Sequence, residues 1–256
     1  MKKPSPKLVT VTTVTSVTPN MQRITLQSES LKDFPSNCEG GYIKLLFTPS
    51  GETDPKLLAE NERPAMRTYT VRKFDASTAS IEVDFVRHIT LDLGCGFAAR
   101  WAMDAKVGDT ISIVGPGIIE DMNTEADWFA MSADMTALPA LSAKIRRLPA
   151  NAQGFAVIKV VSEQDIQPIQ APENMTVKWI FEDEDLEEAV RAQPWLEGTP
   201  SVWCACEFDS MRALRQYFRN EKEVDRENIY ISSYWKQGVS EDGHKLIKRE
   251  DAETQG

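Results

Sequence analysis

The pattern of apolar residues changes near the middle of the chain, and this change limits the folds that are possible. The first half contains six short segments rich in Val, Thr and Ile, separated by turn residues: 8–17, 21–27, 41–47, 67–74, 80–87 and 110–114. Within 80–87, Ile81, Val83 and Phe85 alternate with polar residues, which is the period of a strand with one buried face. Six short strands of this kind predict a small closed antiparallel β-barrel, because closure removes exposed strand edges.

The second half alternates between strand-like and helix-like segments. The expected strands are 128–132, 155–162, 176–182, 201–207 and 228–235, and the expected helices are 136–148, 186–193 and 210–221. Such alternation predicts a mostly parallel sheet with helices on both faces. An acidic linker separates the halves, so we expect a β-barrel domain over 1–120 and an α/β domain over 121–256. The charged tail, 240–256, is expected to form either a short helix or a disordered end.

Composition argues against several classes of partner. The net charge of −10 and the pI near 4.9 disfavour binding to nucleic acid or to an anionic membrane surface. The chain lacks a run of about 18 apolar residues, so no membrane span is expected. Its four cysteines form no C-x-x-C pair and it has only two histidines, so no metal site is expected. The lysines near the N-terminus precede no apolar segment, which favours a cytoplasmic protein.

The stretch Arg67-Thr68-Tyr69-Thr70 carries a ligand signal within the expected barrel. Because strand side chains alternate, Arg67 and Tyr69 share one face while Thr68 and Thr70 share the other. A guanidinium beside an aromatic ring suits a ligand in which a phosphate lies near a ring system. The competing interpretation is an exposed arginine on an ordinary barrel strand.

One helix is expected to interrupt the strands, over Gly96–Met103, after the sequence Asp92-Leu93-Gly94-Cys95. Small residues at a helix start leave backbone N–H groups open to an anion, and such an end is a natural pyrophosphate site. Many helices begin this way without a ligand. The signal therefore gains weight only if this helix start lies beside Arg67.

Seven segments, taken in order, resemble the siderophore-interacting proteins, a branch of the ferredoxin-reductase superfamily whose members are FAD-dependent ferric-siderophore reductases. The matching segments run across nearly the whole chain: Arg67-Thr68-Tyr69-Thr70-Val71-Arg72, Asp84-Phe85-Val86-Arg87-His88, Ala98-Ala99-Arg100-Trp101-Ala102, Gly115-Pro116-Gly117, Asp134-Met135-Thr136-Ala137-Leu138-Pro139-Ala140, Ala205-Cys206-Glu207 and Tyr234-Trp235-Lys236-Gln237-Gly238. The resemblance implies a ferredoxin-reductase-like fold, with FAD on the barrel and NAD(P)H on the α/β domain.

The resemblance also implies roles for individual residues. Arg67 would contact the FAD pyrophosphate, Tyr69 would pack on the isoalloxazine, and Thr70 would lie near its reactive N5 edge. Further cofactor contacts are expected at Val86, His88, Gly96, Ala98, Ala99 and Thr136, the last at the end of the first parallel strand. For His88 a strand-end surface histidine is the competing interpretation.

The chain departs from the family pattern at a few positions where nicotinamide and substrate would meet the flavin. Ala133 and Met135 replace the glycine and glutamate of the family's Gly-Asp-Glu-Thr-Ala, and Cys206 replaces the glycine of Ala-Gly-Glu. Gly117 stands where the family's Gly-Pro-Arg-Gly has an arginine. These differences affect donor preference and pocket charge rather than flavin binding.

The implied activity is release of iron from a siderophore by reduction of Fe(III) to Fe(II), with electrons from NAD(P)H or reduced ferredoxin. The cofactor carries the redox chemistry, and we assign no catalytic residue to the protein. Two alternatives are a general NAD(P)H:flavin or ferredoxin reductase, and a siderophore-binding flavoprotein without efficient turnover.

Two acidic residues bear on the electron donor. Glu163 and Asp165 follow the second expected parallel strand, where a carboxylate suits a ribose hydroxyl and repels a 2′-phosphate. This placement favours NADH over NADPH. Two solvated loop carboxylates are the competing interpretation.

Two lysines are candidates for binding the ferric siderophore. Lys44 alternates with Ile43 and Leu45, so it faces away from the barrel interior if those two are buried. Lys236 follows the last strand, at the carboxyl edge where a ligand is expected. We expect both to attract the chelate by charge. Further positive charge lies in the tail, at Lys245, Lys248 and Arg249, for which a solvated tail is the competing interpretation.

Overall fold

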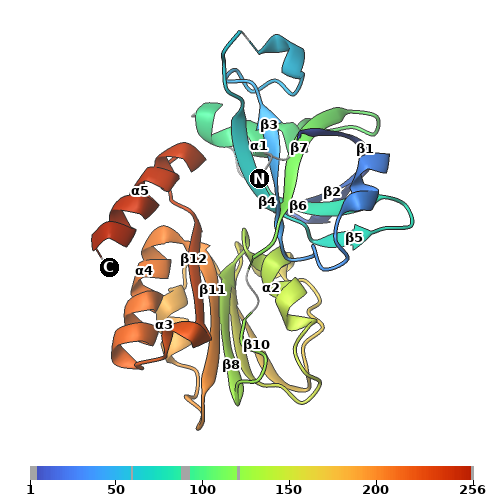
Figure 1. The fold of residues 1–256 in the computed structure, drawn as a ribbon. Helices are drawn as coiled ribbons and strands as arrows, with labels where there is room; N and C mark the ends of the chain where they lie inside the picture. The colour runs from blue at the N-terminus through green and yellow to red at the C-terminus, as the bar shows by residue number, and fades with distance from the viewer. Residues whose placement is uncertain (1–4, 59, 88–92, 120–121, 255–256) are drawn as a thin grey trace. The chain divides into compact units, whose positions relative to one another are not determined.

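The computed structural model describes residues 5–58, 60–87, 93–119 and 122–254 (Figure 1). The chain divides into two compact units, Met1–Ile119 and Glu120–Gly256. The first is an antiparallel β domain and the second a parallel α/β domain, which confirms the predicted fold class. Within the described ranges, no helix combines the length and the apolar character needed to cross a bilayer.

The first unit is a seven-stranded antiparallel sheet with one α-helix. Its strands are β1 (Lys7–Thr18), β2 (Met21–Gln27), β3 (Tyr42–Phe47), β4 (Ala65–Thr70), β5 (Lys73–Asp75), β6 (Ser80–Val86) and β7 (Thr110–Gly117), and its helix is α1 (Leu93–Asp104). Hydrogen bonding connects them in the order β4-β3-β7-β1-β2-β6-β5, with every pair antiparallel.

The segment 67–74 was expected to be one strand, and the structure corrects this: it forms two, so the sheet has seven strands rather than six. Before the break, Val71 N donates to Gly41 O at 2.9 Å; after it, Arg72 N donates to Glu82 O at 2.9 Å. The chain leaves one partner strand for another within two residues, which interrupts the ladder. Because the end strands β4 and β5 are consecutive in the chain, the sheet closes on itself through this bend.

The barrel interior is filled by alternate residues of its strands. On β3, Ile43, Leu45 and Phe47 are at most 1% exposed, and Lys44 lies half-buried on the opposite face, as the alternation predicts. Similar inward rows from the other strands complete the core, among them Val9, Val11, Ile24, Leu26, Ile81, Val83, Ile111 and Ile113.

A charge network fastens the bend that closes the barrel. The Asp84 carboxylate on β6, with a side chain only 3% exposed, accepts from Arg23 Nε at 2.6 Å and from Arg23 Nη2 at 2.9 Å. Arg72, in the bend, lies 3.4 Å from Asp84 through Nε and 2.6 Å from Glu82 through Nη1. One buried carboxylate thus holds β2, β6 and the bend together.

The second unit is a five-stranded parallel sheet in the order β10-β9-β8-β11-β12. The strands are β8 (Trp128–Asp134), β9 (Gln153–Lys159), β10 (Asn174–Ile180), β11 (Pro200–Glu207) and β12 (Ile229–Trp235). Helices α3 (Leu186–Arg191) and α4 (Phe208–Gln216) cover one face and α2 (Leu138–Ile145) the other (Figure 1). The strand order reverses between β8 and β11, and a ligand crevice is expected beyond the carboxyl ends of these two strands.

The charged tail forms a helix, α5 (Glu241–Thr254), packed against the edge strand β12. The buried His244 ring lies 2.8 Å from Ser233 Oγ, and Lys248 Nζ donates to Ser233 O at 3.1 Å. Asp251 pairs with Arg215 of α4 at 2.7 Å. Of the tail cations proposed as extra positive charge, Lys248 is therefore bound to β12, and Lys245 is paired with Glu241 at 3.2 Å.

We expect Asp84→Asn to destabilise the first unit, because it leaves two half-buried arginines around a neutral amide. Breaking a buried charge pair of this kind costs on the order of 3 kcal/mol. The measurement is urea unfolding followed by circular dichroism. The matched control is Glu29→Gln, which removes a carboxylate paired with Lys32 at 2.6 Å on the exposed surface and should change little. Equal stability of the two variants would show that the network does not secure the bend.

Candidate functional site

Strand β4 presents its side chains as the alternation predicts. Arg67 pairs in register with Leu45 and Tyr69 with Ile43, so both share the inward face of the barrel wall. Arg67 is 7% exposed and Thr68 is exposed. The inward position of Arg67 is unusual for a charged residue, and it excludes the interpretation of a solvent-exposed arginine.

The structure brings Arg67 beside the beginning of α1. The Arg67 guanidinium carbon lies 5.3 Å from the centroid of the Phe97 ring, and Nη1 donates to Met66 O at 2.9 Å. A guanidinium next to the free N–H groups of a helix start is a donor set that suits a pyrophosphate. The two sequence signals, separated in the chain, therefore converge.

The helix itself differs from the prediction at its start. It begins at Leu93, so Gly94 and Gly96 lie inside the helix instead of before it. Gly96 is the fourth residue of the helix, and only the three residues before it have backbone N–H groups without an intrahelical partner. Ala98 and Ala99 lie in the second turn, where N–H groups bond to carbonyls one turn earlier, and both side chains are buried.

Tyr69 belongs to an aromatic cluster formed by β4, β6 and α1. Its ring centroid lies 4.4 Å from that of Phe85, which lies 5.8 Å from that of Trp101. This packing fixes the orientation of the Tyr69 ring. Val86, the last residue of β6, is half-buried beside Phe85. His88 lies outside the described residues.

The outward face of the same wall carries a second row of side chains. Thr70 on β4 pairs with Tyr42 on β3, which pairs with Gly117 on β7, and Thr68 pairs with Lys44 in the neighbouring row. Lys44 Nζ lies 6.0 Å from the Tyr42 ring centroid. Within the described residues no salt bridge is seen for Lys44.

In the second unit, Asp134 holds three strands together at the switch point. Its carboxylate accepts from Thr136 N at 2.9 Å, from Thr136 Oγ1 at 2.6 Å and from Trp235 Nε1 at 2.7 Å. Burial raises the pKa of the Asp134 carboxyl above its usual range, and hydrogen bonds from Thr136, Trp235 and the Glu207 backbone oppose that shift. Thr136, a predicted cofactor contact, thus also orders this edge of the sheet.

Lys236 lies at the carboxyl edge, as expected, but its charge is balanced locally. Its Nζ contacts both carboxylate oxygens of Asp209, at 3.0 and 2.9 Å, and lies 4.9 Å from the Phe208 ring centroid. Lys44 and Lys236 therefore differ in how much positive charge each presents.

Of the two acidic residues expected to select the electron donor, one is exposed and the other is buried. Strand β9 ends at Lys159, earlier than predicted, and Glu163 and Asp165 form a short 3₁₀ turn beyond it. Asp165 is 0% exposed and accepts from Ser162 Oγ at 3.2 Å, so it does not face a ligand. Glu163 is exposed.

Cys204 and Cys206 are free and fully buried on β11, which confirms that they are core thiols. Their Sγ atoms lie 3.9 Å apart. The contact with Cys204 and the loss of water raise the pKa of the Cys206 thiol well above its ordinary value, so it stays protonated.

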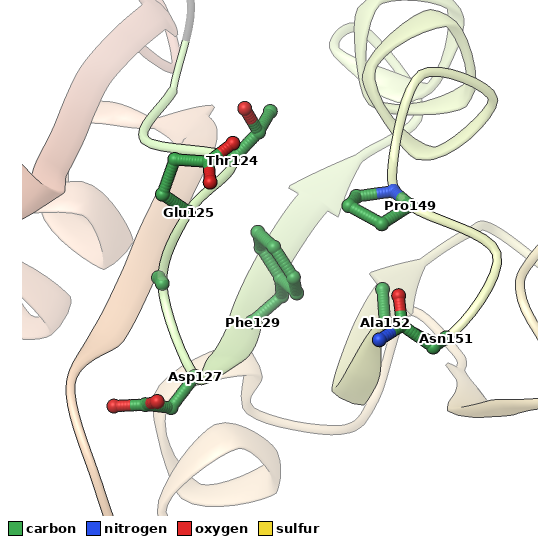
Figure 2. Close-up of a pocket in the computed structure, with 8 residues that line it drawn as sticks. Thr124, Glu125, Asp127, Phe129, Pro149, Asn151 and Ala152 are labelled. Atoms are coloured by element: carbon green, nitrogen blue, oxygen red, sulfur yellow. The ribbon is translucent and has the colours of Figure 1, made fainter.

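A shallow pocket of about 330 Å³ lies at the amino ends of β8 and β9. Figure 2 shows Phe129 between the segment that carries Thr124, Glu125 and Asp127 and the turn that carries Pro149 and Asn151. Parallel sheets bind ligands at the opposite, carboxyl edge. The pocket therefore has no part in the candidate site.

Sequence reasoning missed two contacts of the site: the Trp235 indole on Asp134, and the Tyr42 ring on Gly117. Both join residues far apart in the chain. The only sequence signal for the first was that both residues lie at ends of expected parallel strands, which share one edge. The contact between Tyr42 and Gly117 could not be predicted, because it depends on the register of β3 against β7.

Comparison with known proteins finds a matching family model for each of the two units. A sequence model described as the siderophore-interacting FAD-binding domain matches residues 10–119, and one described as siderophore-interacting protein matches residues 126–238. Ferric vibriobactin reductase ViuB from Vibrio cholerae serotype O1 is 32% identical over 255 residues, covering 93% of this chain and 92% of that protein.

Two further proteins extend the comparison. The NADPH-dependent ferric-chelate reductase of Escherichia coli K12 is 26% identical over 239 residues, covering 89% of this chain and 91% of that protein. The crystal structure of the siderophore-interacting protein SipS from Aeromonas hydrophila matches with a TM-score of 0.85 and 30% identity, covering 98% of this chain and 99% of that one.

Proposed function

This chain belongs to the siderophore-interacting protein family, and from that membership we propose that it is an FAD-dependent ferric-siderophore reductase. The observation that carries the proposal is that Arg67, on the same strand face as Tyr69, lies beside the first turns of α1, inside the segment that matches the FAD-binding model. The substrate is Fe(III) held by a siderophore, and the product is Fe(II), which hard oxygen ligands hold less tightly.

The residues present fit FAD. Arg67 and the N–H groups of the first three residues of α1 supply donors for the pyrophosphate, and Gly96, which has no side chain, leaves room for it beside them. Tyr69 supplies a ring whose orientation is fixed by Phe85. Thr70, on the opposite face of the same strand, supplies a hydroxyl for the reactive edge of the flavin. When bound, FAD would supply the redox chemistry, which is hydride acceptance from a nicotinamide donor and single-electron transfer to Fe(III).

The protein itself binds the cofactor and the ferric siderophore, orients the flavin ring and neutralises negative charge. Arg67 balances pyrophosphate charge, Tyr69 holds the ring plane, and Lys44 and Lys236 attract the chelate. Thr136, at the carboxyl edge of the second unit, is our proposed contact for a nicotinamide nucleotide. No proton transfer by a side chain is required.

The donor is proposed to be NAD(P)H, with reduced ferredoxin as an alternative. The exposed Glu163 favours NADH, because a carboxylate repels a 2′-phosphate, although the E. coli relative is named NADPH-dependent. The free thiols of Cys38, Cys204 and Cys206 suit a reducing compartment, so we place the protein in the cytoplasm.

Arg67→Ala should release FAD. The variant loses the buried cation that faces the pyrophosphate, and we expect little flavin to remain with the protein after gel filtration, as measured by absorbance. Thr68→Ala, next to it but exposed, is the matched control and should keep its flavin. Full flavin retention by Arg67→Ala would contradict the assignment.

Stopped-flow absorbance tests the activity and the donor together. We expect NADH to reduce the flavin with a higher kcat/KM than NADPH, and ferric siderophore to reoxidise it rapidly under anaerobic conditions. Equally fast turnover with free flavin or ferredoxin as acceptor would favour a general reductase. Binding of the siderophore without reoxidation would favour a flavoprotein that only binds it, and a clear NADPH preference would remove the role given to Glu163.

The lysines are tested by titrating an anionic ferric siderophore into Lys44→Ala, Lys236→Ala and the double variant at several salt concentrations. We expect the larger loss of affinity from Lys44→Ala, because Asp209 already balances Lys236. Affinity of the parent protein should fall as salt rises. Unchanged affinity of the double variant with intact flavin, or a parent affinity independent of salt, would remove both lysines from the site.

A further inference from the structure

The Tyr42 ring lies flat on Gly117. A Cβ atom built on Gly117 would overlap Cζ, Cε1 and Cε2 of Tyr42, with Cζ the nearest, so it would stand on the face of the ring and not at its edge. Both residues are half-buried and pair in register on β3 and β7. One face of the phenol ring is therefore packed on backbone, and only a residue without a side chain permits this.

The surroundings of Tyr42 are those of a ligand contact. Thr70, which we place at the reactive edge of the flavin, pairs with Tyr42 across β3 and β4. Lys44, two residues along the same face, holds its ammonium 6.0 Å from the ring centroid. A fixed aromatic face and a cation thus lie next to the residue proposed to orient the flavin.

This arrangement changes the chemistry of the wall. The family pattern has an arginine where this chain has Gly117, and a guanidinium there would attract any anionic chelate. With glycine, the position carries no charge and its space is taken by a ring, which favours flat aromatic groups by stacking. Lys44 remains to offset negative charge.

We propose that Tyr42 is a substrate contact and that it biases this protein toward siderophores that hold Fe(III) through aromatic rings, such as catecholates, over hydroxamates. The inference rests on the proposed reductase function and names the substrate class of that same site. Gly117 acts through Tyr42, as a positioning residue that lets the ring lie flat.

The test compares two probes, ferric tris(2,3-dihydroxybenzoate) and ferric desferrioxamine B, titrated into the oxidised holoprotein by flavin fluorescence. Each variant is compared with the parent on the same probe, so the differing charges of the probes cancel. Tyr42→Ala should weaken the aryl probe on the order of fivefold, a typical size for one aromatic contact, and leave the hydroxamate probe unchanged. Tyr42→Phe keeps the ring and should stay within about twofold on both.

Gly117→Ala is a second variant that keeps Tyr42 but displaces its ring, and we expect the same selective loss. Flavin content, measured by absorbance, shows that each variant is folded and loaded. No loss with Tyr42→Ala, or equal losses for the two probes, would overturn the inference while leaving the reductase function intact. A parent protein that holds flavin but neither binds nor reduces either probe would overturn both.

Discussion

The closing bend of the barrel is the constraint on which the flavin side of the molecule depends. Val71 and Arg72 carry the chain from pairing beside β3 to pairing beside β6, and the buried Asp84 carboxylate holds Arg72 there. Because β4 ends at this bend, the bend sets the register of β4 against β3. That register places Arg67 and Tyr69 on the inward face, where the start of α1 and the Phe85 ring meet them.

The second unit depends on a comparable anchor. Asp134 ends β8 and accepts hydrogen bonds from Thr136, which follows β8, and from the last residues of β11 and β12, so one carboxylate fixes the carboxyl edge around the switch point. Two polar side chains at this edge already have partners. Thr136 is bonded to Asp134, and Lys236 is paired with Asp209.

The structure shows the surroundings of two departures from the family pattern. Gly117 lacks the family's cation and is covered by Tyr42, and Cys206 is a protonated core thiol where the family has glycine. The first change replaces a cation with a position covered by an aromatic ring, and the second places a sulfur atom in the core of the second unit.

The sequence by itself determined the class of each domain and the faces of its strands, because the periods of strand and helix are local properties of a few neighbouring residues. It predicted that Arg67 and Tyr69 share a face and that Lys44 points outward. It did not predict that 67–74 divides into two strands, that α1 begins at Leu93, or that Asp165 is buried. Strand partners, register and burial depend on contacts between distant segments, such as Arg72 with Asp84 and Tyr42 with Gly117, and only the tertiary structure decides these.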